Sequence, residues 1–509
     1  MKNIKILFGL ILIVTLSIVS CDEATVEVDP IGDTEAGFFQ NEEQMTMAVM
    51  GIYQKVTFFH TFRGGNWLSG IWLLPGDNLT TEGDHGYENF VGINAQDGKL
   101  GDFYRYAYQL IARANTVLQK IEENGDFAYS LEPELKDFHR GEALFLRSWM
   151  NFRLWNVYGS AAPLINERIT NLDDAYPASS QGTELLDQAI SDLAEAATLL
   201  PDSWDGGNKG RVTKNSALAL QGKILVFRGT VSNSTSDFSD ALTAFNAITG
   251  ADLMPNYGDN FDAAKENNIE SFFEFQANNQ AQVNNPYLDN DAFSVVGDIG
   301  AYLGFYSKTP GWIGSNFYFA SPEFVALVEG DPRAEYSIKV DAEKKINVVK
   351  YLRDGNRVDS WPQWTEVHRT NIRILRYADV LLLKAEAIIR SGGNAADAIA
   401  LINQIRERAR NSTTDGTMSE IPADLDVAET DSDLILEWIY NERRIELAFE
   451  EGHRWYDLRR RHLAGEIDLT NFDFNSAKPD FKFEAHNIYF PLPSNEVIQN
   501  KNLVQNTGY

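Results

Sequence analysis

The feature that most constrains the fold is a pair of adjacent helical segments near residue 390. Apolar residues recur at three- and four-residue spacing over 375–390 and again over 395–410, and Ser391-Gly392-Gly393-Asn394 interrupts the pattern. One face of the second segment carries Ala398, Leu401, Ile402, Ile405 and Ala409. A break this short makes the two helices antiparallel neighbours, so the sequence predicts a helical hairpin.

The hairpin is close to the ~34-residue length of a tetratricopeptide (TPR) unit, although the TPR consensus is not clearly met. Helical spacing also predicts helices over 36–58, 101–122, 133–158, 183–200, 214–229 and 238–248, and a last pair over roughly 432–464. Segments 60–100 and 250–370 are rich in Gly, Asn, Asp and aromatics, with β-like pieces at Ser271–Phe275 and Ile346–Tyr351. The predicted fold is mainly α: TPR-like helical hairpins form a scaffold, and a large irregular, loop-rich insertion with short β segments is built over it.

Charge and cysteine content exclude several classes of function. The chain has 73 acidic and 44 basic residues, a net charge of −29, so nucleic acid and anionic lipid are disfavoured as partners. Hydrophobic residues make up 44% of the chain, which is enough for a large core. Cys21 is the single cysteine, and this excludes disulfides within the chain and zinc sites built from cysteines.

The N-terminus has the organisation of a secretory leader. Lys2 and Lys5 precede an apolar stretch from Ile6 to Val19, which is too short for a standard membrane-spanning helix of ~20 residues. Ile18-Val19-Ser20-Cys21 resembles a bacterial lipobox, with Ile in place of the usual first Leu. This resemblance implies a signal peptide over 1–20, acylation of Cys21 and an acidic lipidated tether over 21–35; the alternative is a chance cysteine near an ordinary cleavage site.

Signatures of catalysis are missing from the sequence. It contains no H-E-x-x-H, G-x-S-x-G, P-loop or G-x-G-x-x-G motif. Asp289-Asn290-Asp291 lacks the other positions of an EF-hand and is interpreted as a turn. We therefore expect no catalytic residue, no metal ion and no cofactor, although paired carboxylates of a glycoside hydrolase cannot be recognised from spacing alone.

Motifs along most of the chain resemble one known family. The C-terminal third contains RYADVLLLKAEA from Arg376, ERRIELAFEEGHRWYDLRR from Glu442, YFPLP from Tyr489 and QNTGY at the end. Upstream, the corresponding marks are Ala48–Tyr53, Arg113-Ala114-Asn115, Glu142–Arg147, Tyr158-Gly159, Glu270-Ser271-Phe272 and Asp331-Pro332-Arg333. Together they resemble the SusD/RagB family of outer-membrane nutrient-binding lipoproteins. Two departures are an extra Glu in Glu450-Glu451-Gly452 and Lys501 in place of a proline.

The resemblance implies a domain plan and a function. It implies one SusD-like domain over 36–509, with a helical scaffold at about 36–250 and 371–509 and a ligand-facing region at about 251–370. The implied function is that of a non-enzymatic, lipid-anchored protein of the cell surface. Such a protein captures oligo- or polysaccharide at the outer membrane and delivers it to a SusC-like TonB-dependent transporter. A RagB-like peptide binder and an extracellular glycoside hydrolase are the alternatives.

Charged residues within the C-terminal motifs interrupt otherwise apolar helices. They include Glu442, Arg443, Arg444, Glu446, Arg454, Asp457 and Arg459. We interpret them as an ion-pair network that holds the last helices against the body. The alternative is a ligand site.

The predicted glycan site lies in the irregular segments. Flat aromatic rings cover the C–H face of a sugar while polar groups bind its hydroxyls. The predicted ligand-binding residues are Trp67, Trp72 and Trp312, each in a glycine-rich setting, with Tyr302, Trp361, Asn66, Asp77 and Asn78. Further loop candidates are Tyr87, Tyr306, Tyr318, Trp364, Arg63, Asn316 and Asp354. The alternative for each tryptophan is a place in the core.

Overall fold

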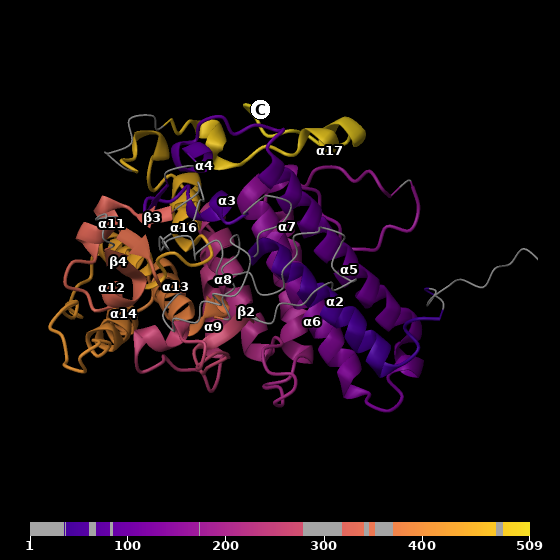
Figure 1. Ribbon diagram of the computed structural model, residues 1–509, viewed down its shortest axis with the longest axis horizontal. Coiled ribbons are helices and arrows are strands. Elements are labelled where there is room, and N and C mark those ends of the chain that lie inside the picture. The colour runs from indigo at the N-terminus through magenta and orange to yellow at the C-terminus, as the bar shows by residue number, and fades with distance from the viewer. Residues whose placement is uncertain are drawn as a thin grey trace, which may run out of the picture.

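The N-terminal half of the protein is a row of helices. A computed structural model describes residues 35, 37–60, 68–81, 85–172, 174–277, 318–340, 346–351, 370–474 and 482–509. The row consists of α2 (Glu42–His60), α5 (Gly98–Ala128), α6 (Glu134–Tyr158), α7 (Glu184–Leu199), α8 (Lys214–Ser232) and α9 (Thr235–Asn246). Each of these helices packs against the next (Figure 1), as expected for stacked helical hairpins.

The predicted hairpin of the C-terminal part is confirmed. It consists of α13 (Tyr377–Arg390) and α14 (Ala395–Arg410), and α15 (Ser432–Glu446) and α16 (His453–Leu463) form the predicted last pair. The turn between α13 and α14 contains Gly392 at a φ of 75°, and the Asn394 side chain accepts a hydrogen bond from the Ala396 amide that caps α14. Helix α13 also packs against α8 and α9, which joins the two halves.

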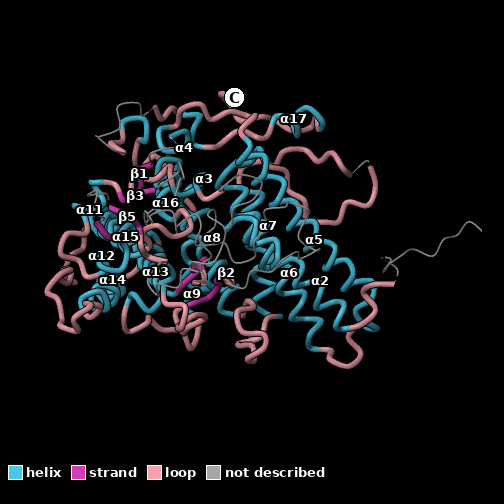
Figure 2. Tube along the Cα trace, in the orientation of Figure 1, coloured by secondary structure: helices cyan, strands magenta, loops and turns pink. Residues whose placement is uncertain are grey.

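Short elements make up the irregular part (Figure 2). The strands are β1 (Leu79–Thr81), β2 (Ser271–Phe275), β3 (Tyr318–Ala320), β4 (Ile338–Val340), β5 (Ile346–Val348) and β6 (Ile372–Arg376). They form an antiparallel sheet of order β1-β3-β5-β4 and an antiparallel β2-β6 pair. The short helices are α3 (Gly70–Leu73), α4 (His85–Asn89), α11 (Pro322–Leu327), α12 (Arg333–Ser337) and α17 (Ser494–Gln499). Single 3-10 turns cover Gly159–Ala161, Tyr257–Phe261, Leu469–Asn471 and Ala485–Ile488.

Two apolar clusters form the core. The larger one runs through the helix row and includes β2 and β6, and the smaller one fills the space between α13, α14 and α15. On α14 the buried residues Ala398, Ile402, Ile405 and Ala409 follow helical spacing, which is the pattern that identified the hairpin in the sequence. No helix in the described ranges is long and apolar enough to cross a membrane.

A buried ion-pair network surrounds Glu446, the last residue of α15. Its carboxylate is fully buried and accepts hydrogen bonds from Arg376 (2.6 Å), Arg333 (2.9 Å) and Arg408. Burial raises the pKa of Glu446, but the three arginines lower it by more, so the net pKa lies well below its usual range. We call these four residues, with Glu270 and Glu450, the Glu446 cluster.

The two outer carboxylates extend the Glu446 cluster to β2 and to the turn after α15. Glu270 accepts from Arg376 (2.8 Å) and Arg408 (3.1 Å), and Glu450 binds Arg376 (2.8 Å) and Lys350 (2.6 Å). Two of the family motifs therefore have a structural role. Glu270 of Glu270-Ser271-Phe272 pairs with two arginines of the cluster. Within Asp331-Pro332-Arg333, Asp331 pairs with Arg333 at 2.7 Å.

A second buried network joins α8, α13, α15 and α16. Asp379 lies between Lys223 (2.8 Å) and Arg443 (2.7 Å). Asp457 then bridges Arg443 (2.7 Å) and Arg460 (3.0 Å), and Arg460 continues the chain of contacts to Glu386 of α13. The interpretation of the motif charges as a lock between the last helices and the body is therefore confirmed except for Arg459, which binds the carbonyl oxygens of Ile488 and Asn156 and the Asn156 side chain in place of a carboxylate.

Helices α8 and α9 approach each other at a glycine. A Cβ atom on Gly222 of α8 would lie 2.3 Å from Cε1 of Phe245 on α9. This distance is far inside van der Waals contact, so the two helices can lie this close only because residue 222 has no side chain.

We expect Gly222→Ala to lower the free energy of unfolding by up to about 2 kcal/mol, because the overpacking costs ~1–3 kcal/mol and the gain in helix propensity offsets only ~1 kcal/mol of it. Thermal and denaturant unfolding measure this change. Gly101→Ala is the matched control, since Gly101 is also helical and its added Cβ would meet nothing within 4 Å. Stabilisation of both variants to the same extent would contradict the close approach.

Candidate functional site

The predicted ligand-binding residues fall into two groups. Trp67, Trp312, Tyr302, Trp361 and Asn66 lie outside the described residues, as do Cys21, Arg63, Asp289-Asn290-Asp291, Tyr306, Asn316, Asp354 and Trp364. Trp72, Asp77 and Asn78 are described and buried, and so are the loop candidates Tyr87 and Tyr318. The structure therefore assigns surroundings to only part of the predicted site.

Trp72 is a core residue, which corrects its predicted role as a sugar platform. It lies in α3, and only 1% of its surface is exposed. The guanidinium of Arg153 lies 4.1 Å from the centre of its ring, and Phe103 packs at 6.2 Å. A Cβ on Gly452 would lie 2.7 Å from the Trp72 carbonyl oxygen. The glycine-rich surroundings thus serve close packing, and the ring is not presented to a ligand.

Asp77 and Asn78 are held by two arginines of the C-terminal motif, which also corrects their predicted role. Asp77 accepts hydrogen bonds from Arg454 at 2.6 and 2.9 Å and pairs with Arg444 at 3.1 Å. Asn78 accepts from Nε of Arg444 at 2.8 Å. Burial raises the pKa of Asp77, but the two arginines lower it by more. These two residues fix the start of β1 to α15 and α16, and their hydrogen-bonding groups face the protein.

Three described residues beside the ends of undescribed segments lie next to one another. The His60 ring, at the end of α2, stacks on Phe275 of β2 with centroids 5.5 Å apart. Phe275 is paired with Ile372 of β6. Segments 61–67 and 278–317, which carry Trp67, Tyr302 and Trp312, therefore start beside these residues, and segment 352–369, which carries Trp361, ends beside them. We call His60, Phe275 and Ile372 the loop roots.

Glu451, in the Glu450-Glu451-Gly452 part of the C-terminal motif, contacts the His60 loop root. It accepts a hydrogen bond from His60 Nε2 at 2.8 Å and another from Arg153 at 2.6 Å. It belongs to a tight turn in which Phe449, Glu451 and Gly452 all have positive φ, at 65°, 38° and 75°. At this departure from the family pattern both glutamates are therefore buried and ion-paired, and Glu451 fixes the end of α2.

The electrostatics of this turn are those of a structural ion pair. Burial raises the pKa of Glu451, but His60 and Arg153 lower it by more, and the net pKa is about 2. A histidine beside a carboxylate can serve as a general base, yet His60 has no exposed surface and contacts no nucleophile among the described residues. The geometry therefore supports a positioning role for Glu451 and His60.

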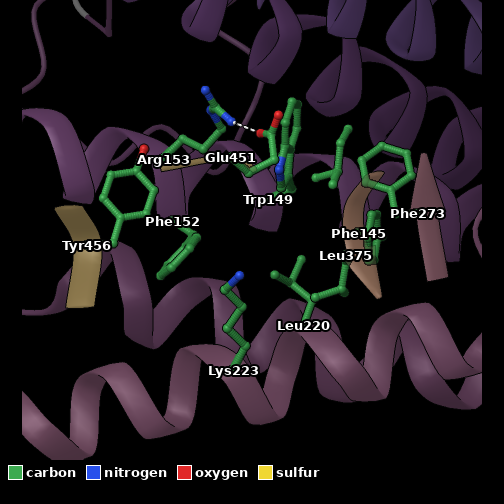
Figure 3. A pocket seen from close by; sticks show the side chains of 11 residues that line it. Phe145, Trp149, Phe152, Arg153, Leu220, Lys223, Phe273, Leu375, Glu451 and Tyr456 are labelled. Atoms are coloured by element: carbon green, nitrogen blue, oxygen red, sulfur yellow. Dashed lines mark hydrogen bonds and ion pairs between the residues drawn. The ribbon is translucent and has the colours of Figure 1, made fainter. Parts of the chain in front are cut away.

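A small cavity lies beside this ion pair (Figure 3). Its walls come from α6, α8, β2, β6 and the start of α16, and Arg153, Lys223, Glu451 and Tyr456 are its polar residues. Its volume of about 20 Å³ is enough for roughly one water molecule. The cavity is far too small for a sugar ring, so it is part of the scaffold.

Metal binding finds no support in the described part of the chain. No group of three or more His, Cys, Asp or Glu side chains there is arranged to hold a metal ion. The buried acidic residues described above are instead neutralised by arginine, lysine or histidine at hydrogen-bond distance.

Glu451→Gln should reduce stability in a pH-dependent way. Because the pKa of Glu451 is lowered in the folded state, its contribution is complete above the ordinary value of 4.5 and is lost as the pH falls toward 2. We expect the variant to lose about 3–5 kcal/mol at neutral pH, and to show a shallower fall in thermal midpoint than the parent below about pH 4.5.

Asp126→Asn is the control for this measurement, because Asp126 is fully exposed and its pair with Lys136 lies at the surface, where ion pairs contribute little. Parallel stability–pH curves for the parent and Glu451→Gln would contradict the ion-pair assignment.

Comparison with known proteins agrees with the sequence motifs. A sequence profile of the SusD family matches residues 337–509, and a second profile, described as starch-binding associating with outer membrane, matches residues 82–226. SusD-like protein P2 of Formosa agariphila is 25% identical, and the alignment covers the whole of both chains.

Solved structures show the same architecture. A laminarin-binding SusD-like protein is 25% identical, with a TM-score of 0.71 over 92% of this chain and all of that chain. A SusD homologue from Bacteroides thetaiotaomicron has a TM-score of 0.78 over 94% of this chain and 99% of its own; at 21% identity it shows the fold alone. The predicted mainly α, TPR-like scaffold is confirmed by these matches, and the chain belongs to the SusD family.

Proposed function

We propose that this protein is a glycan-binding lipoprotein of the cell surface. It captures oligo- or polysaccharide at the outer membrane and delivers it to a SusC-like TonB-dependent transporter, without breaking a bond. Membership of the SusD family supports the binding role, and one matching family profile is described as associating with the outer membrane. Acylation of Cys21, surface exposure and the transporter partner follow from the leader and the family resemblance.

The observation that carries this proposal is the convergence of the loop roots. Sugar binding at useful affinity needs several aromatic rings along one oligosaccharide, because a single neutral hydrogen bond contributes only ~0.5–1.5 kcal/mol. Segment 61–67 starts at the end of α2, segment 278–317 starts just after β2, and segment 352–369 ends just before β6, and these three elements are neighbours. Neighbouring starting points allow rings from different segments to contact one chain of sugars.

We therefore keep as proposed ligand-binding residues only those that lie in segments 61–67, 278–317 and 352–369. They are Trp67, Trp312, Tyr302, Trp361 and Asn66, and Trp72, Asp77 and Asn78 are removed because they are buried and bound within the protein. The scaffold beneath them is fixed by the Glu446 cluster and by Glu451. A rigid base under several ring-bearing segments lowers the entropic cost of binding.

A carbohydrate is favoured over a peptide by one relative. The laminarin-binding SusD-like protein matches nearly the full length of this chain at 25% identity. A family member that binds a neutral glucan with this fold supports a neutral glycan as the ligand class. The net charge of −29 also disfavours polyanionic glycans.

Calorimetric titration with laminarin, starch, xylan and mannan tests the proposed function. We expect the parent to bind at least one of them, and the triple variant Trp67→Ala, Trp312→Ala, Trp361→Ala to bind at least 100-fold more weakly, since each lost ring costs about 1 kcal/mol or more. Assays for new reducing ends should stay at background with all four polysaccharides.

Trp438→Ala is the control, because this tryptophan packs against the smaller core cluster on α15 and lies outside the loops. Unchanged glycan affinity in the triple variant would overturn the site. Selective binding of a peptide library, or release of sugars, would overturn the function.

Fractionation of bacterial cells tests the anchor. Several acyl chains hold a protein stably on a membrane, at ~0.8 kcal/mol for each buried methylene. We expect the parent to sediment with outer membranes and Cys21→Ala to appear in the soluble fraction. Membrane association of both proteins to the same degree, after a high-salt wash, would contradict acylation.

A further inference from the structure

A polar cleft on the scaffold is lined by described residues alone. It is formed by the α7–α8 connection, where Trp204, Lys209 and Arg211 line it, and by the residues leading into β2, where Asn267 and Asn268 line it. Its solvent-filled volume is about 240 Å³. We call this hollow the Trp204 cleft; none of its residues belongs to segments 61–67, 278–317 or 352–369.

We infer that the Trp204 cleft is a second carbohydrate-binding site of this protein. The inference rests on the proposed glycan function and adds a contact that the loop segments do not provide. It is carried by a rigidly held, partly buried indole ring that lines a hollow together with fixed amides and exposed polar side chains.

The Trp204 ring is fixed on three sides. Its Nε1 donates a hydrogen bond to the Val212 carbonyl at 2.8 Å, and the guanidinium of Arg211 lies 3.8 Å from the centre of the ring. Phe138 of α6 packs against it edge-on at 5.5 Å. A ring that is immobilised before the ligand arrives loses little entropy on binding.

Arg211 is itself held from beneath. Its guanidinium makes a two-pronged contact with the buried carboxylate of Glu142 of α6, at 2.7 and 2.5 Å. Glu142 also accepts a hydrogen bond from the Tyr53 hydroxyl of α2 at 2.8 Å. The arginine already satisfies the carboxylate, so this ion pair does not depend on the tryptophan. Trp204 lines the cleft with the part of its surface that stays exposed.

The polar lining suits the hydroxyls of a neutral sugar. Asn215 is held by the Thr249 backbone, Asn267 is paired with Gln276, and Asn268 bonds the Lys265 carbonyl. Each amide group has two N–H donors and two acceptor lone pairs, so capacity remains on both atoms. Ordered amides beside an aromatic ring form the combination that binds both the hydroxyls and the C–H face of a sugar.

Exposed groups at the rim carry balanced charge. Asp202, Ser203 and Lys209 are exposed, and their side chains make no ion pair or hydrogen bond within the described ranges. One acid and one base give the rim no net charge, which favours a neutral ligand over a polyanion. The volume lies below the ~300 Å³ typical of pockets for drug-sized ligands, so it suits roughly one or two sugar rings.

A second contact of this size matters chiefly for polymers. When two weak sites engage one polysaccharide chain, the second contact becomes intramolecular and the apparent affinity rises without any new interaction. The Trp204 cleft should therefore contribute more to binding of a polysaccharide than of a short oligosaccharide.

The test compares cleft variants with the parent on laminarin, starch, xylan and mannan by calorimetry. We expect Trp204→Ala to weaken binding of the recognised polysaccharide by about threefold to tenfold. The double variant Asp202→Ala, Lys209→Ala should weaken it by a smaller factor while its thermal midpoint stays that of the parent, because both side chains are exposed and make no hydrogen bond or ion pair within the described ranges. Tyr176→Ala, which removes a half-exposed aromatic elsewhere, is the control and should bind as the parent does.

The outcomes separate the two proposals. A parent that binds a polysaccharide while Trp204→Ala and the double variant both keep full affinity overturns the Trp204 cleft and leaves the glycan function standing. A parent that binds none of the four polysaccharides overturns both. If Trp204→Ala loses stability, the folded double variant decides: a measurable loss of affinity supports the cleft, and none overturns it.

Discussion

The carboxylate of Glu446 is shared by three buried arginines that come from separate parts of the chain. Arg333 belongs to α12, Arg376 ends β6, and Arg408 lies near the end of α14. A buried charge is costly unless it is paired and hydrogen-bonded, so removing one member leaves the others uncompensated by roughly 3–5 kcal/mol. This requirement makes the positions of three distant elements depend on one side chain.

This network of ion pairs fixes the positions of the loop roots. Arg376 joins Glu446 to Glu270, which immediately precedes β2, and to Glu450, which precedes the turn at Glu451. Glu451 then holds His60 and Arg153, while Asp77 is held by Arg444 and Arg454. The family motif of the C-terminal helices thus has a structural role: it fixes the strands and the helix end at which the undescribed segments start or end.

The helical part of this fold was predictable because its signal is local. The spacing of Ala398, Ile402 and Ile405 and the break at Gly392 and Gly393 define the hairpin without knowledge of other contacts. Charges on otherwise apolar helix faces also indicated an ion-pair network correctly. The partners of those charges were not predictable, because Asp77 and Arg454 or Glu270 and Arg376 are brought together only by the complete fold.

The site predictions were weaker for the same physical reason. Glycine next to Trp72 is compatible with an exposed ring and with close packing, and the contact with Gly452 that decides between them is a long-range one. Trp204 gave no signal in the sequence, because its distinguishing features are the stacked Arg211 and the cleft beside it, which involves Asn267 and Asn268 from a remote segment. Burial and neighbourhood, which decide whether a ring can meet a ligand, are properties of the folded chain.

Hydrogen exchange of the Glu446→Gln protein, followed by mass spectrometry at neutral pH, tests the dependence of the frame on this cluster most directly. The account predicts that amide protection falls together in β2, β6, α12, α14 and α15, while α5 and α6 keep the protection of the parent. Protection lost only within α15, or β2 and β6 unchanged, would contradict it.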